Sequence, residues 1–212
     1  MDVAHPIRTA IPTLDGRVLE VLAGTTAPLS TSEVHRLCGD GSYAGVRLVL
    51  LRLAEQGVAI ADARRSATYF VASREHLAWP AIEILTGLRS ALLDGLRDRI
   101  AAWAVPPIHA SLFGSAARAD GDAASDIDIL LVRADGLSEA DEATWETQIA
   151  DLREWVRAAT GNRCGPFSIT LSRLDEHLAA HDPLVEEWRR DGITLAGDDI
   201  VTLCRARRGA DT

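Results

Sequence analysis

The sequence predicts an α+β protein with an N-terminal helical part that ends in a β-hairpin, followed by a C-terminal part with a small mixed β-sheet. Three helical periodicities and then two short alternating runs occupy residues 12–73. Farther along, over 106–200, apolar runs typical of strands are separated by helical stripes and turn residues. A chain of 212 residues with 47% hydrophobic content is long enough for two domains with their own cores. We expect the domains at 1–78 and 106–200, a connecting helix at 79–105, and a frayed tail at 201–212.

The first domain is predicted from apolar periodicity, a capping signal and a turn. Its first helix carries a stripe of valine and leucine, and the Ser-x-x-Glu pattern at 30–33 opens the second helix. The third helix has apolar residues at i, i+3, i+4 and i+7 over 46–53. Alternating residues then predict two strands joined by an Arg-Arg-Ser turn at 64–66.

This order of elements resembles a winged helix-turn-helix domain. The resemblance implies that the third helix enters the major groove of double-stranded DNA through Ser42, Tyr43 and Arg47. It also implies that Arg64 and Arg65, at the tip of the hairpin, contact the DNA backbone or the minor groove. The alternative is a winged helix that only mediates dimerisation or docks on the second domain. The net charge does not decide between DNA binding and these alternatives, because the first 80 residues carry eight acids and eight arginines.

The connecting segment is predicted to be one long helix over 82–104. Apolar residues recur there at steps of three or four, from Leu85 to Trp103, and form a single stripe. This stripe fits packing against the second domain, and it equally fits pairing with a second copy of the chain in a homodimer. Two consecutive prolines at 106–107 end the helix.

Gly114-Ser115, followed by two aspartates at positions 126 and 128, is the part of the sequence that indicates chemistry. Residues i and i+2 of a strand share one face, so Asp126 and Asp128 project together. Two such carboxylates can hold a pair of Mg²⁺ ions for in-line phosphoryl transfer. Gly114 lets the backbone approach a phosphate, Ser115 adds a hydroxyl, and Arg118 adds a positively charged fork.

This pattern, with its Gly-Ser turn, its arginine and Ser-Asp-x-Asp, resembles the nucleotidyltransferase superfamily that contains DNA polymerase beta. It is most similar to the minimal nucleotidyltransferase branch, over roughly residues 105–200. The resemblance implies a nucleotidyltransferase that uses an NTP and two Mg²⁺ ions to modify a hydroxyl acceptor and releases pyrophosphate. Acceptors in the superfamily include protein side chains, RNA ends and small aminoglycoside-like molecules. Minimal members often act as antitoxins on a partner toxin, so a partner protein is one expected acceptor.

One departure from the family concerns a third carboxylate that its enzymes carry on a neighbouring strand. The strand predicted at 167–171 has Ser168 and Thr170 on one face, and neither is an acid. A hydroxyl is a poor Mg²⁺ ligand and a poor base, so we interpret these two residues as a degenerate third position. Three acids could substitute, although the sequence does not place them in the site: Asp120, Asp122 and Asp175.

Two functions therefore stay open from the sequence. The first is a Mg²⁺-dependent nucleotidyltransferase whose winged helix binds DNA. The second is a winged-helix transcription regulator whose degenerate nucleotidyltransferase domain senses a nucleotide or only mediates assembly.

Composition excludes several other classes of protein. All 22 basic residues are arginine, so a lysine nucleophile, a Schiff base and a Walker-type phosphate lysine are excluded. An odd number of widely spaced cysteines argues for reduced thiols rather than a disulfide or zinc framework. Neither a signal peptide nor a membrane span is recognisable, so we expect a cytoplasmic protein with no membrane partner. His109 is expected to be a core or edge histidine. The three cysteines are Cys38, Cys164 and Cys204.

Overall fold

The computed structural model describes residues 1–65 and 67–210 and confirms the α+β class. Ser66, the last residue of the predicted hairpin turn, lies outside the described residues. So do residues 211–212 of the predicted tail.

The chain divides into two compact units, which we describe separately. The N-terminal unit contains Asp2 and residues 4–89. The C-terminal unit contains Met1, Val3 and the chain from Ser90 onward.

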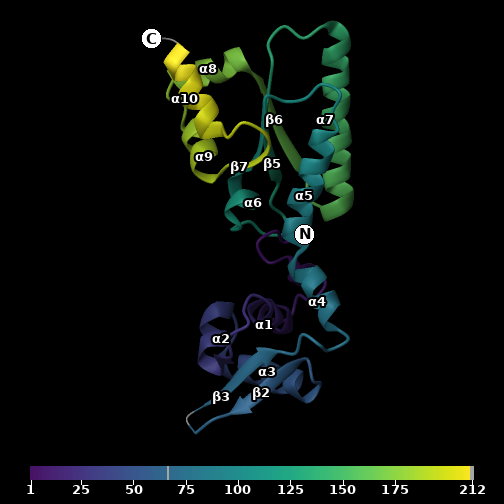
Figure 1. The fold of residues 1–212 in the computed structure, drawn as a ribbon, viewed down its shortest axis with the longest axis vertical. Coiled ribbons are helices and arrows are strands. Elements are labelled where there is room, and N and C mark those ends of the chain that lie inside the picture. The colour runs from purple at the N-terminus through teal and green to yellow at the C-terminus, as the bar shows by residue number, and fades with distance from the viewer. Residues whose placement is uncertain (66, 211–212) are drawn as a thin grey trace. The chain divides into compact units, whose positions relative to one another are not determined.

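The N-terminal unit has the predicted order of three helices followed by a hairpin (Figure 1). It also contains a two-residue strand, β1, that the sequence did not reveal. Its three strands form an antiparallel sheet in the order β1-β3-β2. The elements are a 3₁₀ helix at Pro6–Thr9, α1 (Leu14–Ala23), β1 (Leu29–Ser30), α2 (Thr31–Cys38), α3 (Tyr43–Glu55), β2 (Ala59–Ala63), β3 (Thr68–Ala72) and α4 (Trp79–Thr86).

Local signals in this unit act as predicted. Ser30 caps α2 by accepting a hydrogen bond from the Glu33 amide, and the Glu33 side chain accepts one from the Ser30 amide at 2.7 Å. This reciprocal pair is the predicted capping box. The apolar positions of the third helix, α3, are all buried in the core of the unit, and they are Val46, Val49, Leu50 and Leu53.

The single long helix predicted at 82–104 is wrong, because two helices, α4 and α5 (Leu88–Ala101), occupy the region. Trp79 and Ile82 of α4 are buried in the N-terminal core, whereas Leu96 and Ile100 of α5 are buried in the C-terminal core. The helices are separated at Gly87, which has φ −86° and ψ −1°. The buried side chains of α5, among them Leu92, Leu96 and Ile100, pack within the C-terminal unit.

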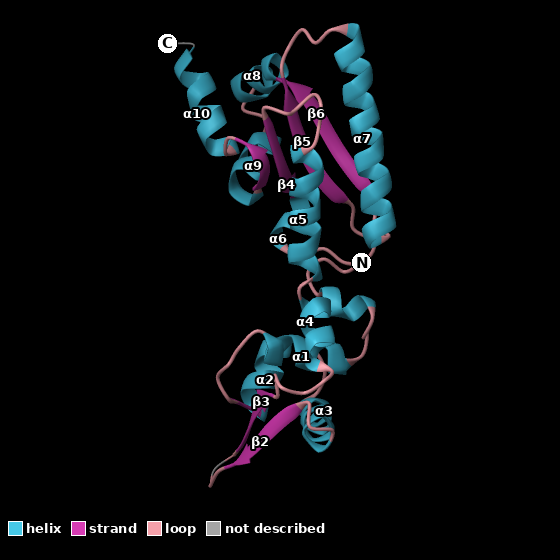
Figure 2. Cartoon of the chain, turned by 45° about the vertical axis from the view of Figure 1, so that its right-hand side comes forward, coloured by secondary structure: helices cyan, strands magenta, loops and turns pink. Residues whose placement is uncertain are grey.

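The C-terminal unit is built on a four-stranded sheet in the order β6-β5-β4-β7. Figure 2 shows β4, β5 and β6 side by side in this sheet. β4 is antiparallel to both of its neighbours, and β5 runs parallel to β6. The strands are β4 (His109–Phe113), β5 (Ile127–Arg133), β6 (Cys164–Thr170) and β7 (Ile193–Gly197). The remaining helices are α6 (Gly114–Arg118), α7 (Glu139–Thr160), α8 (Leu171–Ala179), α9 (Pro183–Asp191) and α10 (Ile200–Ala210).

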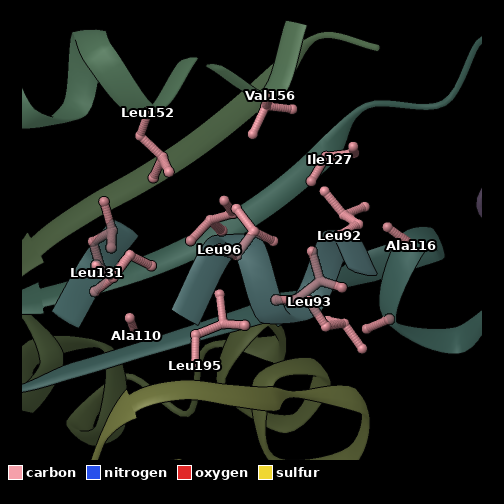
Figure 3. Packing of buried hydrophobic residues seen from close by; sticks show 14 of the residues in the cluster. Leu92, Leu93, Leu96, Ala110, Ala116, Ile127, Leu131, Leu152, Val156 and Leu195 are labelled. Atoms are coloured by element: carbon pink, nitrogen blue, oxygen red, sulfur yellow. The ribbon is translucent and has the colours of Figure 1, made fainter. Parts of the chain in front are cut away.

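Helices cover both faces of this sheet. α5 and α7 pack on one face, and α8, α9 and α10 pack on the other (Figures 1 and 2). On the first face, Leu96, Leu131 and Leu152 come from α5, β5 and α7 and join one cluster (Figure 3). Burying a leucine of this kind stabilises a fold by about 1.5–3 kcal/mol relative to leaving it exposed. β5 is therefore rigid, since apolar side chains anchor it from both faces.

The last described residues are not a frayed tail, as the sequence analysis expected, but the helix α10. Leu203 and Cys204 are buried against the second face of the sheet. Arg207 donates a hydrogen bond from Nε to Asp175 of α8 at 2.9 Å. These contacts attach the helix to the C-terminal unit.

The histidine in β4 is a core residue. His109 is fully buried, with Nδ1 2.6 Å from the Asp198 carbonyl oxygen and Nε2 2.9 Å from the Ser111 hydroxyl. Burial lowers the pKa of His109, which favours the neutral ring.

None of the helices in the described part of the chain combines the length and apolar character that a bilayer span requires.

Candidate active site

Asp126 lies directly before β5 and Asp128 is its second residue, and β5 is an inner strand between β4 and β6. Asp128 pairs with Phe113, the last residue of β4. Gly114 follows Phe113 in the chain, so the Gly-Ser turn lies beside the N-terminal end of β5, next to Asp128. The sequence-predicted residues Gly114, Asp126 and Asp128 thus meet at one edge of the sheet.

The Asp128 carboxylate is enclosed by two glycines. A Cβ placed on Gly114, whose φ is +68°, would lie 2.9 Å from Asp128 Oδ2. A Cβ placed on Gly165, the β6 partner of Asp128, would lie 2.6 Å from Oδ1. Both distances are shorter than a real Cβ contact, so only glycine fits at either position without a shift of the carboxylate. We call this arrangement of Gly114, Asp128 and Gly165 the glycine notch.

Electrostatics around the notch favour a cation. Burial raises the pKa of Asp128, and the charges of Asp126 and Glu187 raise it further. Burial also raises the pKa of the neighbouring Cys164 thiol to about 12, with smaller contributions from the same two aspartates. Cys164 is therefore a protonated thiol at neutral pH and no nucleophile. A divalent cation at the notch would relieve the repulsion between the carboxylates.

Ser115 lies in α6, and the loop after this helix folds back over its hydroxyl. A Cβ on Gly121 would lie 2.8 Å from Ser115 Oγ and 3.0 Å from Ser125 Oγ. Asp122 fixes the loop by accepting a hydrogen bond from the Ser125 hydroxyl at 3.0 Å, which lowers the pKa of Asp122. The Ser115 hydroxyl is thus close to the loop that leads into Asp126.

Arg118 of α6, which was predicted to bind a phosphate, forms ion pairs with one acid just after α6 and two acids of α9. Its Nε lies 2.9 Å from Asp120, and its Nη1 lies 3.0 Å from Asp191 and 3.3 Å from Glu187. Hydrogen bonds to Asp120 and Asp191 raise the pKa of Arg118, so it remains charged. A phosphate would have to displace at least one of these carboxylates to use the guanidinium.

The degenerate third position predicted at Ser168 and Thr170 is corrected by the register of β6. Gly165 is the residue paired with Asp128, whereas Ser168 and Thr170 pair three and five residues farther along β5. These odd offsets place both hydroxyls on the face of the sheet opposite Asp128. The misplacement arose because the sequence does not reveal the register of β6 against β5, in which Gly165 pairs with Asp128.

Both hydroxyls have structural partners. Ser168 Oγ accepts a hydrogen bond from Trp145 Nε1 of α7 at 3.0 Å. Thr170 caps α8 by accepting one from the Arg173 amide at 3.2 Å. Ser168 therefore provides the hydrogen-bond acceptor for a buried indole N–H, and Thr170 provides one for a backbone amide in the first turn of α8.

The three alternative acids also have partners of their own. Asp120 pairs with Arg118, Asp122 fixes its loop, and Asp175 pairs with Arg207 of α10. Besides Asp126, the acid whose charge raises the pKa of Asp128 is Glu187 of α9, and the sequence did not point to this residue. No sequence signal identifies it, since α9 begins more than 50 residues after the aspartates.

The fit to Mg²⁺ rests on the two aspartates. Among the described residues, no group of three or more His, Cys, Asp or Glu side chains is arranged to hold a metal ion. Mg²⁺ commonly takes one or two protein carboxylates and completes its octahedron with substrate phosphates and water. The pair Asp126 and Asp128 fits a metal that arrives with a nucleotide, and it does not form a complete protein cage.

The candidate DNA-contacting residues of the N-terminal unit lie in two places. On α3, Tyr43 and Arg47 are exposed, while Ser42 caps the helix by accepting a hydrogen bond from the Gly45 amide at 3.1 Å. On the hairpin, Arg64 pairs with Asp62 at 2.8 Å, and Arg65 is exposed. Tyr43 and Arg47 also line a pocket of about 240 Å³ with hydroxyl residues from the start of α2.

Comparison with known proteins finds similarity to solved structures. No family model matches the chain, and no curated protein matches it. One similar solved structure, "Crystal structure of the toxin-antitoxin with AMP-PNP", has 20% sequence identity and a TM-score of 0.37, and it covers 56% of this chain and 86% of that chain. Another, a mutant of the toxin-antitoxin MntA-HpeT, has 16% identity and a TM-score of 0.36, and it covers 56% of this chain and 85% of that chain.

Proposed function

We propose that the C-terminal unit is a Mg²⁺-dependent nucleotidyltransferase that moves a nucleotide from an NTP to a hydroxyl acceptor and releases pyrophosphate. The observation that carries the proposal is the glycine notch, which fixes the Asp128 carboxylate between two backbones, with Asp126 two residues away. A carboxylate enclosed in this way has few accessible positions. Such preorganisation is what metal-assisted phosphoryl transfer requires.

Each residue at this edge has a role in the proposal. Asp126 and Asp128 would hold the two ions, which supply Lewis-acid stabilisation of the phosphates when bound. The backbone at Gly114 approaches the triphosphate without a side chain in the way, and Ser115 offers a hydroxyl. Arg118 would exchange one of its carboxylate partners for a phosphate oxygen.

A second function is favoured by the state of Arg118 and by the missing acid on β6. With Arg118 engaged by three carboxylates and no acid on the β6 residue beside Asp128, the unit has fewer groups for chemistry than for binding. A winged-helix regulator that senses a Mg²⁺-bound nucleotide would need only the binding half of the site. The two functions use the same residues, and they differ in whether an acceptor is modified.

For the N-terminal unit we propose a winged helix that binds double-stranded DNA. α3 would present Tyr43 and Arg47 to the major groove, and the hairpin would bring Arg64 and Arg65 to the backbone or the minor groove. Exposure of Tyr43, Arg47 and Arg65 supports the proposal. Ser42 contributes through its helix cap. We also propose that a partner protein supplies the hydroxyl acceptor, because the sequence resembles the minimal nucleotidyltransferases.

The proposed nucleotide site is tested by calorimetric titration of ATP, CTP, GTP and UTP in the presence of Mg²⁺. We expect the wild type to bind at least one NTP and the Asp126→Ala/Asp128→Ala variant to lose that binding. Asp98→Ala removes an exposed acid of α5 in the same unit, and we expect this control to bind as the wild type does. Equal binding by the wild type and the double variant would remove the site assignment.

A further inference from the structure

Asn162 is a buried polar residue between α7 and β6. Its side chain is 3% exposed, and it follows Gly161, which ends α7 in the left-handed conformation at φ +77°. A buried amide costs free energy unless its hydrogen bonds are satisfied, so its partners indicate why it is there.

Both amide hydrogens of Asn162 hold the loop that leads into the first aspartate. Nδ2 donates to the carbonyl oxygen of Ser125 at 2.9 Å and to that of Ala123 at 3.3 Å. The next residue, Arg163, accepts a hydrogen bond at its carbonyl from the Ile127 amide at 2.8 Å. The backbone is thus fixed directly before and directly after Asp126.

The environment of Asn162 defines the orientation of its amide. Its own N–H donates to Thr160 Oγ1 at 3.1 Å, and its Oδ1 accepts from the Met1 nitrogen at 2.6 Å. With the oxygen engaged on one side, the NH₂ group points to the loop. The choice of residue follows, because an aspartate has no hydrogen to donate and an alanine would leave two carbonyls without these donors.

We propose that Asn162 is the positioning residue that fixes Asp126 relative to Asp128. Asp126 needs such support because it precedes Ile127, the first residue of β5, and so lies outside the strand ladder that holds Asp128. A metal pair requires its ligands to be held within about 0.5 Å. The proposal rests on the proposed function of Asp126 and Asp128, and it adds the residue that sets their spacing.

The test compares the wild type with Asn162→Ala and Asn162→Asp in two measurements. The first is the Kd for Mg²⁺, measured by calorimetry at a saturating concentration of whichever NTP the wild type binds. We expect both variants to raise this Kd about tenfold or more, as is typical when a group that orients a metal ligand is lost.

Val156→Ala is the matched control, since Val156 is fully buried on α7, the helix that ends just before Asn162, and its side chain has no polar group that could hydrogen-bond to the loop. We expect this variant to lower the melting temperature without removing a hydrogen bond to the loop, and its Kd for Mg²⁺ should equal that of the wild type. An unchanged Kd in both Asn162 variants, or an equal loss in Val156→Ala, would overturn the proposal.

The second measurement separates this inference from the function on which it rests. Hydrogen exchange of residues 123–127 in the metal-free protein should be faster in Asn162→Ala than in Val156→Ala. If the wild type binds no NTP, the proposed function fails, and exchange alone still decides whether Asn162 fixes the segment around Asp126. Equal exchange in the two variants would refute the positioning role.

Discussion

Gly165→Ala is expected to displace the Asp128 carboxylate, because the new Cβ would lie 2.6 Å from Oδ1. An ordinary van der Waals contact begins at 3.4 Å, so the two atoms must separate by about 0.8 Å. Gly114 closes the other side of the notch, where a Cβ would lie 2.9 Å from Oδ2, so the carboxylate has little room to retreat. Overpacking of this kind typically costs about 1–3 kcal/mol of stability.

The larger effect should be on function. A misplacement of about 1 Å at a reacting centre can lower activity about 10²-fold, so we expect a loss of this order in NTP-dependent transfer. The displaced carboxylate should also raise the Kd for the NTP measured in the presence of Mg²⁺, and this assay needs no acceptor. Gly24→Ala is the control, because its Cβ would meet only ordinary contacts at 3.5 and 3.6 Å. Wild-type affinity in Gly165→Ala would show that the notch does not hold the metal-binding carboxylate.

The remaining predictions concern charge. Because burial raises the pKa of Asp128, Mg²⁺-dependent NTP binding should weaken as the pH falls through a range above the ordinary aspartate value of 3.8. Because the folded state raises this pKa, the ionised Asp128 carboxylate destabilises the metal-free fold as the pH rises through the same range. Asp128→Asn should therefore raise the melting temperature at pH 7. A lower melting temperature would contradict burial as the cause of the raised pKa. Arg118→Ala should weaken NTP binding while leaving the free energy of unfolding nearly unchanged, since partly exposed ion pairs contribute little to stability; denaturation and titration on one sample check both. Arg47→Ala should weaken DNA binding uniformly across sequences and reduce the salt slope by about 1 if Arg47 contacts a phosphate, whereas a sequence-selective loss in a salt series would indicate base contact.

Local sequence signals predicted much of the secondary structure. The capping box at Ser30 and the apolar face of α3 depend only on residues within one turn, and both form as expected. β5 was predictable because its apolar run is buried on both faces. The break at Gly87 was not, because this residue keeps a nearly helical backbone and the apolar stripe continues in phase across it. Periodicity alone does not reveal that the two halves of a stripe belong to different cores.

The candidate site shows the same division between local and tertiary information. The spacing of Asp126 and Asp128 was visible in the chain, and so was the Gly-Ser turn. The start of β6 was missed because Gly165 is followed by a proline, a poor strand signal that is tolerated here since β6 is an edge strand. Glu187 and Asn162 come from distant elements, and only the fold brings them to the aspartates.

The central claim is that Asp126 and Asp128 bind the metal ions of a nucleotide substrate. Its most direct test is anomalous diffraction from Mn²⁺ in crystals grown with a non-hydrolysable analogue of the NTP that binds most tightly. The account predicts Mn²⁺ within about 2.0–2.3 Å of oxygens from both carboxylates, with phosphate oxygens completing the coordination. A bound nucleotide whose Mn²⁺ contacts neither aspartate would contradict it.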